Sequence, residues 1–143
     1  MTHVLTLNAG SSSLKTGLYS LRDGTPELMA RGHVDRIGTE ASPRLTGPTG
    51  NEIEGLPLDQ AQTHSAALRA TLSAIESGFP DIQVHLVGHR VVHGGPDFAA
   101  PVVLSAKVIE TLETLVPFAP LHQPHNLAGV RAAISEFPEA TQV

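Results

Sequence analysis

Alternating apolar and polar positions in the first part of the chain predict a series of short β-strands, because one face of each segment is apolar. The clearest case is Leu14, Thr16 and Leu18, which alternate with polar or small residues. Clusters of Gly, Pro, Asn and Asp separate the segments and are typical of turns. Strands are predicted at Val4–Leu7, Leu14–Tyr19, Glu27–Gly38, Pro43–Thr46 and Asn51–Leu56.

After residue 60 the apolar spacing changes to the period of a helix. A helix is predicted over Gln60–Gly78, and a strand over Ile82–Val92. Ser105 is suited to cap a second helix, and Pro124 to lie in the first turn of a third. Their apolar stripes are Val108, Leu112 and Leu115 in the second helix, and Leu127, Val130, Ile134 and Phe137 in the third.

This order of elements predicts a mixed sheet with helices packed on it. Strands come first, and helix, strand and helix alternate afterwards. The pattern by itself leaves α/β and α+β arrangements open. Gln142 and Val143 are typical of the first residues of a further core strand.

Composition and charge narrow the function. The 143 residues suffice for one domain with a core, and 41% of them are hydrophobic. A net charge of -5 without any basic cluster argues against binding of nucleic acid. The absence of cysteine excludes disulfides and thiolate metal sites. Apolar runs are too short to span a bilayer and no leader is recognisable, so we expect no membrane partner and a cytoplasmic location.

The segment Asn8-Ala-Gly-Ser-Ser-Ser-Leu-Lys15 is the first candidate for chemistry. Gly10 can adopt a positive φ, and small residues let the backbone approach a ligand closely. Hydroxyls, free amides and Lys15 in one short turn suit phosphate oxygens. It is not a Walker A loop, because no Gly precedes Lys15 and no helix is predicted to follow. The alternative is a polar hairpin whose serines have no ligand.

Two later stretches favour a functional interpretation. They are Gly88-His-Arg-Val-Val-His-Gly-Gly95 and Ala119-Pro-Leu-His-Gln-Pro-His-Asn126. Together with the first turn, and in the same order, they closely resemble the acetate kinase family of short-chain acid kinases. Three long motifs in register are far more specific than any one of them. The resemblance covers essentially the whole chain.

The resemblance implies a fold, a reaction and partners. The fold would be an α/β, ribonuclease H-like half-domain, which this family shares with sugar kinases, actin and chaperone ATPases. The reaction would be reversible transfer of the γ-phosphoryl group of ATP to acetate, giving acetyl phosphate and ADP, with Mg²⁺ or Mn²⁺. A homodimer would be expected. Residues 1–143 would form an incomplete N-terminal domain, cut at a strand, without the nucleotide-binding domain and expected to be inactive alone.

Arg90 and His122 are the predicted catalytic residues. Arg90 ends an apolar strand, and its planar guanidinium suits both the substrate carboxylate and phosphoryl oxygens. The alternative for Arg90 is a surface ion pair. His122 lies between Pro120 and Pro124, and its role, a hydrogen bond to the phosphoryl group in transfer, is implied by the resemblance alone.

The remaining site residues also follow from the resemblance. Ser11, Ser13 and Lys15 match residues beside the phosphates of the nucleotide, and Asn8 matches a position close to the metal. Val92 and Leu121 match a small apolar pocket for the acetate methyl group, with plain core positions as the alternative. Val92 would narrow the pocket, which favours acetate over the alternative substrate propionate.

Two other interpretations stay open. The pairs His89/His93 and His122/His125 have spacings seen in metal sites, but the first pair spans a strand and turn and lacks a third ligand. We therefore interpret His89 and His93 as structural and give His125 no role. The chain could also be a non-catalytic module that retains contacts to anions.

Overall fold

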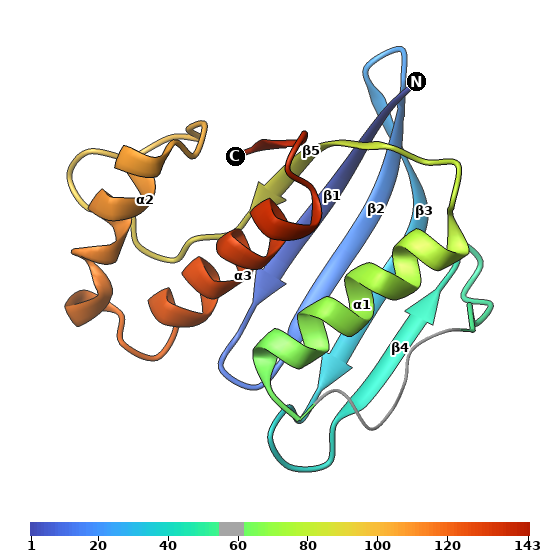
Figure 1. Cartoon of the computed structure of the whole chain (residues 1–143), viewed down its shortest axis with the longest axis horizontal. Coiled ribbons are helices and arrows are strands. Elements are labelled where there is room, and N and C mark those ends of the chain that lie inside the picture. Colours follow the sequence, from blue (N-terminus) through green and yellow to red (C-terminus); the bar gives the residue numbers. More distant parts are fainter. Residues whose placement is uncertain (55–61) are drawn as a thin grey trace.

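The computed structural model describes residues 1–54 and 62–143 and consists of one mixed sheet with its long helices on one face (Figure 1). The sheet has six strands in the order β4-β3-β2-β1-β5-β6. β1 pairs in parallel with β5, and β5 with β6, whereas β1 to β4 are antiparallel neighbours. The strands are β1 (Thr2–Ala9), β2 (Leu14–Arg22), β3 (Thr25–Asp35), β4 (Ser42–Thr46), β5 (Val84–His89) and β6 (Thr141–Gln142).

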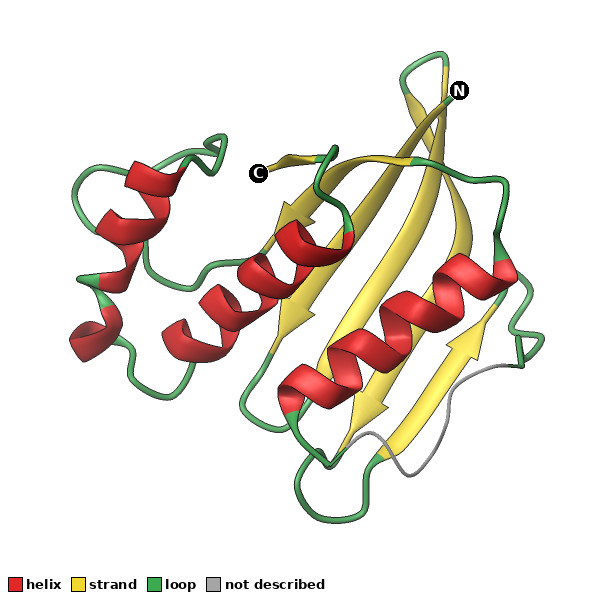
Figure 2. Cartoon of the chain, viewed as in Figure 1, coloured by secondary structure: helices red, strands yellow, loops and turns green. Residues whose placement is uncertain are grey.

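Helices α1 (His64–Gly78) and α3 (Gln123–Glu136) lie side by side across the sheet (Figure 2). Thr63 caps α1, because its hydroxyl accepts a hydrogen bond from the backbone N–H of Ala66 at 3.1 Å. Pro124 lies in the first turn of α3, as predicted. Their buried sides cover a core built mainly of leucine, valine and alanine, including Leu5, Leu18, Leu72 and Val87.

Helix α2 (Ala106–Glu113) and the 3-10 turn η2 (Val116–Phe118) lie beyond the edge of the sheet (Figure 1). Ser105 caps α2 as predicted, accepting the N–H of Val108 at 3.2 Å. Arg131 of α3 forms an ion pair with Glu113 at the end of α2. The predicted strand at Gln142 is present as β6, which adds to the open edge of β5.

The predicted mixed sheet is confirmed, but several element boundaries were wrong. β3 ends at Asp35 instead of Gly38, because Arg36 takes a positive φ of 54° and turns the chain. β5 ends at His89 instead of Val92, where the backbone leaves the ladder. In the region 51–54 only an isolated bridge between Glu52 and Thr46 forms. The rest of the strand predicted there, and the start of the helix predicted from Gln60, lie outside the described residues.

One side chain departs from its predicted helical stripe, and one strand departs from strict alternation. Ile134, predicted on the apolar stripe of α3, is 37% exposed, and Ala133 is buried instead. In β3 the pairing with β2 slips by one residue between Leu18 and Tyr19. The extra residue is Met29, which packs against the core. A bulge of this kind shifts the alternation of a strand, which a strict period of two cannot anticipate.

Candidate active site

The candidate site lies at the carboxyl ends of the parallel strands β1 and β5, where ligands bind in open α/β sheets. A cavity of about 700 Å³ opens there, and both Asn8 and Arg90 line it. Small and apolar residues of the 98–104 segment form another part of its wall. A cation and an amide beside an apolar wall suit a small carboxylate or phosphate ligand.

Arg90 follows directly after β5, and its backbone N–H still donates to the carbonyl of Leu7 in β1 at 3.1 Å. Its side chain is exposed. Among the described residues, no carboxylate forms an ion pair with Arg90. The guanidinium is therefore free to receive an anion. A catalytic Arg90 requires this arrangement, whereas the alternative interpretation was a surface ion pair.

The turn between β1 and β2 carries the predicted phosphate-side residues. It is closed by a hydrogen bond of 2.8 Å from the N–H of Gly10 to the carbonyl of Ser13. Ser11 and Lys15 are exposed, and Ser13 is half-buried. Lys15 lies directly opposite Asn8 in the antiparallel ladder, so these two side chains share one face of the sheet.

The structure places His122 and Leu121 at the amino-terminal end of α3. His122 is the residue that precedes the helix, and its exposed side chain makes no capping hydrogen bond. Leu121 is 71% exposed and Val92 is 44% exposed. Neither belongs to the residues that line the cavity beside Arg90. The apolar pocket for a methyl group therefore stays a prediction from the resemblance.

Two buried amides that sequence reasoning did not single out join these segments. Asn126 of α3 donates to the carbonyl of Ala9 at 2.7 Å and accepts from the N–H of Val92 at 3.0 Å. It thereby ties the end of β1, the segment after Arg90 and α3 together. Its position in the third motif was the only signal that could have identified it.

Gln123, one helical turn earlier, also joins separate segments through its side chain and is completely buried. Its amide nitrogen donates to the carbonyls of His93 and Leu112, at 3.0 and 3.1 Å. Its oxygen accepts the N–H of His93 at 3.3 Å. A buried amide is stable only when it is hydrogen-bonded in this way. Gln123 therefore fixes the loop after Arg90 against both α2 and α3.

His89 and His93 each have a protein partner. The Nε2 atom of His89 lies 2.7 Å from the side-chain oxygen of Gln142 in β6, to which it donates. Burial lowers the pKa of His89, and this hydrogen bond opposes the shift in part. The Nδ1 atom of His93 accepts the N–H of Gly95 at 3.0 Å. Within residues 1–54 and 62–143, no three His, Asp or Glu side chains gather as a metal-binding group.

A divalent cation would find one oxygen ligand here. Asn8 is half-buried and lines the cavity, and an amide oxygen is a ligand that Mg²⁺ accepts. Mg²⁺ usually keeps several waters and is held through one or two carboxylates together with substrate phosphates. Asn8 is therefore compatible with the edge of such a site and would not hold the ion alone.

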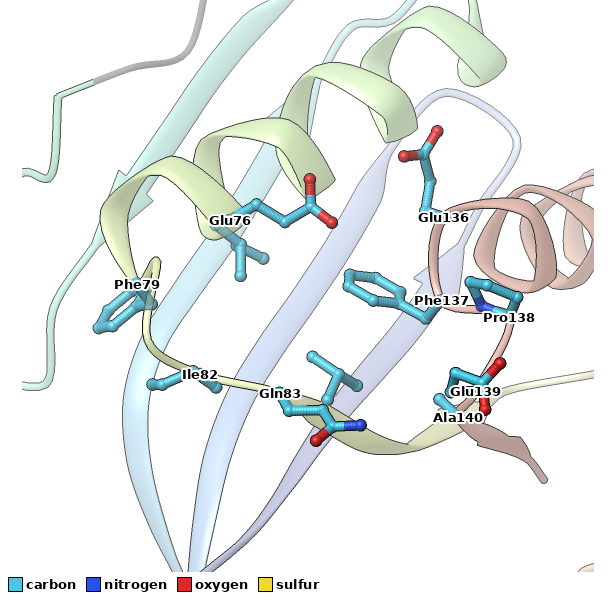
Figure 3. Close-up of a pocket in the computed structure, with 11 residues that line it drawn as sticks. Glu76, Phe79, Ile82, Gln83, Glu136, Phe137, Pro138, Glu139 and Ala140 are labelled. Carbon is cyan, nitrogen blue, oxygen red and sulfur yellow. The ribbon is translucent and has the colours of Figure 1, made fainter.

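A second cavity, of about 310 Å³, lies at the carboxyl-terminal ends of α1 and α3 (Figure 3). Phe137 reaches from the end of α3 toward α1, and Glu76, Glu136 and Glu139 surround the opening (Figure 3). Three carboxylates repel anionic ligands, and none of the predicted site residues lines this cavity. It is not the candidate active site.

The fold and the cleft together define the class: an α/β half-domain with a cation and an amide lining a cavity where two parallel strands end. Comparison with known proteins makes the class specific. The family model described as "Acetokinase family" matches residues 3–143. The chain belongs to the acetokinase family, and the resemblance seen in its three motifs is confirmed.

Individual relatives agree with this assignment. The chain is 40% identical to the acetate kinase of Methylocella silvestris, over 98% of its own length and 37% of the relative. It is 42% identical to that of Streptomyces coelicolor, over 99% of its own length and 35% of the relative. The chain thus spans about a third of the length of these curated relatives.

Solved structures show the same fold. The Porphyromonas gingivalis acetate kinase matches 99% of the chain with a TM-score of 0.81 and 31% identity, over 36% of that structure. A Francisella tularensis propionate kinase matches 99% of the chain with a TM-score of 0.82 and 27% identity, also over 36% of that structure. The predicted half-domain fold is therefore confirmed. No described helix has the length and apolar character needed to cross a membrane.

Proposed function

We propose that this chain forms part of an acetate kinase, which transfers the γ-phosphoryl group of ATP to acetate reversibly. The observation that carries the proposal is the joint position of Asn8 and Arg90 in one cavity at the ends of β1 and β5. Membership of the acetokinase family supplies the reaction class. Because the chain spans about a third of its relatives, the proposed activity is that of the complete gene product.

The proposed reaction mainly requires that negative charge be stabilised. Acetate is ionised near neutral pH, so it needs no general base to become a nucleophile. It must approach a polyphosphate of the same sign, and negative charge spreads over the equatorial oxygens during transfer. Preorganised cations and hydrogen-bond donors lower the barrier by stabilising that charge.

Arg90 and His122 are the proposed catalytic residues. Arg90 can hold the acetate carboxylate and the phosphoryl oxygens together, because its fork presents several donors in one plane. The exposed ring of His122 is available to donate a further hydrogen bond to the phosphoryl group. Val92 and Leu121 would contact the methyl group of acetate.

The turn after β1 is proposed to serve the nucleotide. Ser11, Ser13 and Lys15 would donate to phosphate oxygens of ATP, and Asn8 would hold Mg²⁺ from one side. When bound, the ion supplies positive charge that offsets the charge of the phosphates. The residues of this chain thus position one side of the reacting groups, and positioning alone contributes strongly to phosphoryl transfer.

The test is formation of acetyl phosphate by the purified complete gene product, with ATP, Mg²⁺ and acetate. Arg90→Ala should lower kcat by about 10²–10³-fold, as expected when one preorganised donor is lost. Arg90→Lys should recover only part of the rate, since the planar fork is missing. Arg44→Ala is the matched control, because Arg44 is an exposed arginine on the edge strand β4.

Two results would contradict the proposal. Wild-type protein without acetate-dependent turnover would favour the non-catalytic anion-binding module. Turnover of Arg90→Ala equal to that of Arg44→Ala would remove Arg90 from catalysis.

Propionate in the same assay addresses the second substrate, since one of the matching structures is a propionate kinase. A homodimer is also proposed and is measured by sedimentation.

A further inference from the structure

His64, the first residue of α1, makes a hydrogen bond that no motif predicts. Its Nε2 atom lies 2.7 Å from the backbone carbonyl oxygen of Gly10, in the turn between β1 and β2. A carbonyl can only accept, so Nε2 is the protonated nitrogen of this ring. The two residues are far apart in sequence, and the contact is partly buried.

His125 of α3 holds the ring of His64 from the other side. The two imidazoles are stacked, with ring centroids 4.1 Å apart and an angle of 19° between the planes. Burial lowers the pKa of His125, and the nearby His64 and His122 lower it further. An uncharged His125 can lie flat against its neighbour without repelling it. Helices α1 and α3 therefore meet at the turn through this pair.

The hydrogen bond completes a pattern around the turn. The carbonyls of Ala9 and Gly10 accept from Asn126 and His64. The carbonyl of Ser12 accepts the N–H of Ile37 at 3.0 Å, and that of Ser13 accepts the N–H of Gly10. Carbonyl lone pairs repel phosphate oxygens. Because the protein itself engages these four carbonyls, the turn can present its hydroxyls and amides to an anion.

We propose that His64 is a positioning residue for the phosphate-side turn. It fixes the Gly10 carbonyl through Nε2–H, while the stack with His125 fixes the ring. This inference rests on the proposed function, because it assumes that Ser11, Ser13 and Lys15 face the phosphates of ATP. His64 itself touches neither substrate.

Steady-state kinetics of the complete gene product test the proposal. His64→Leu removes the donor and should lower kcat/KM for ATP about tenfold, the size of effect expected from one lost hydrogen bond. The KM for acetate should change little. His64→Gln keeps an N–H donor of similar reach and should recover most of the loss. His85→Leu and His85→Gln are matched controls, because His85 is exposed and lies in the first half of β5.

The ¹⁵N shifts of the imidazole ring provide a second readout that does not need catalysis. In the hydrogen-bonded ring, Nε2 of His64 should carry a proton. The amide signals of Ser11, Ser12 and Ser13 should move in His64→Leu and stay near their wild-type positions in His64→Gln.

Several results would overturn the inference. These are a ring protonated only on Nδ1, a His64→Leu variant that matches His85→Leu toward ATP, and a His64→Gln variant as impaired as His64→Leu. A parallel rise in KM for ATP and acetate would indicate a general structural effect and would also overturn it. Wild-type protein without acetate-dependent turnover would instead overturn the proposed function, and the ring and amide signals would still decide whether His64 holds the turn.

Discussion

Asn126 shows at the scale of one residue how the site is held together. Its side chain is 5% exposed and satisfies one carbonyl and one N–H from different segments. Removing such a side chain leaves the buried carbonyl of Ala9 and the partly buried N–H of Val92 without this hydrogen bond. The buried carbonyl then costs its desolvation energy, which exceeds the net gain from an ordinary hydrogen bond.

We therefore expect Asn126→Leu, which has a similar size, to destabilise the protein by roughly 1–3 kcal/mol, the cost of leaving the buried carbonyl of Ala9 unsatisfied. Urea denaturation at neutral pH measures the change. Ser135→Ala, on the exposed side of the same helix, is the control and should change stability little. A variant as stable as the control would show that these hydrogen bonds contribute nothing to the fold.

Val92 is the residue with which substrate size is tested. If it contacts the methyl group, Val92→Ala widens the pocket and raises the ratio of kcat/KM for propionate to that for acetate. One methylene group in an apolar pocket is worth roughly 1–3 kcal/mol, so the shift should be modest. An unchanged ratio in the complete gene product would show that the side chain, which is 44% exposed, does not line the pocket.

Gly32 illustrates packing between elements, where β3 meets β2 and α1. A Cβ atom at this position would lie 2.2 Å from Oγ1 of Thr16 and 2.8 Å from Cγ2 of Thr71. Both threonines are buried, so neither can move aside easily. The absence of a side chain lets α1 approach the sheet closely.

Gly32→Ala should consequently destabilise the protein by roughly 1–3 kcal/mol, the usual cost of overpacking a core. Gly78→Ala is the control, because its added atom would meet only Cγ2 of Ile53 at an ordinary 3.5 Å. Thermal unfolding of both variants decides the matter. Equal melting temperatures for the two would contradict the packing argument.

At the scale of elements, the sequence supports prediction of long periodic segments better than of their ends. The helices that become α1, α2 and α3 and most strands were predicted, because their apolar faces repeat over several turns. The ends depend on interactions with other segments. Nothing local places Arg36 at a positive φ, or stops β5 at His89 where the chain enters the cleft.

The sequence likewise identifies some residues of the candidate site and misses others. Motif residues such as Asn8 and Arg90 could be identified from the sequence, and the structure places them in one cavity. The residues that hold these segments in place could not be identified from the sequence. Gln123 and Asn126 point their amides inward only because α3 packs over the ends of the strands, and His64 meets Gly10 only through tertiary structure.

At the scale of the whole molecule, the titration of His89 makes the stability of the protein depend on pH. Because burial lowers its pKa in the folded state, the unfolded chain binds a proton more readily at pH values just below about 6.5. The stability associated with neutral His89 is complete above that value. It is lost as the pH falls toward the pKa of the folded state.

From pH 7.5 to pH 5.5, the free energy of unfolding should therefore fall more in the wild type than in His89→Gln. The variant keeps a donor toward Gln142 but does not titrate. Subtracting the two proteins removes the contribution of carboxylates, which they share. An equal loss in both would show that His89 does not contribute to the pH dependence.

The hydrogen bonds of Asn126 also bear on how the protein moves. One amide group joins the end of β1, the segment after Arg90 and the helix that follows His122. None of these three can swing outward alone without breaking a hydrogen bond to Asn126. A closure around substrates that keeps these hydrogen bonds therefore carries the three segments together as one body, with the hinge outside them.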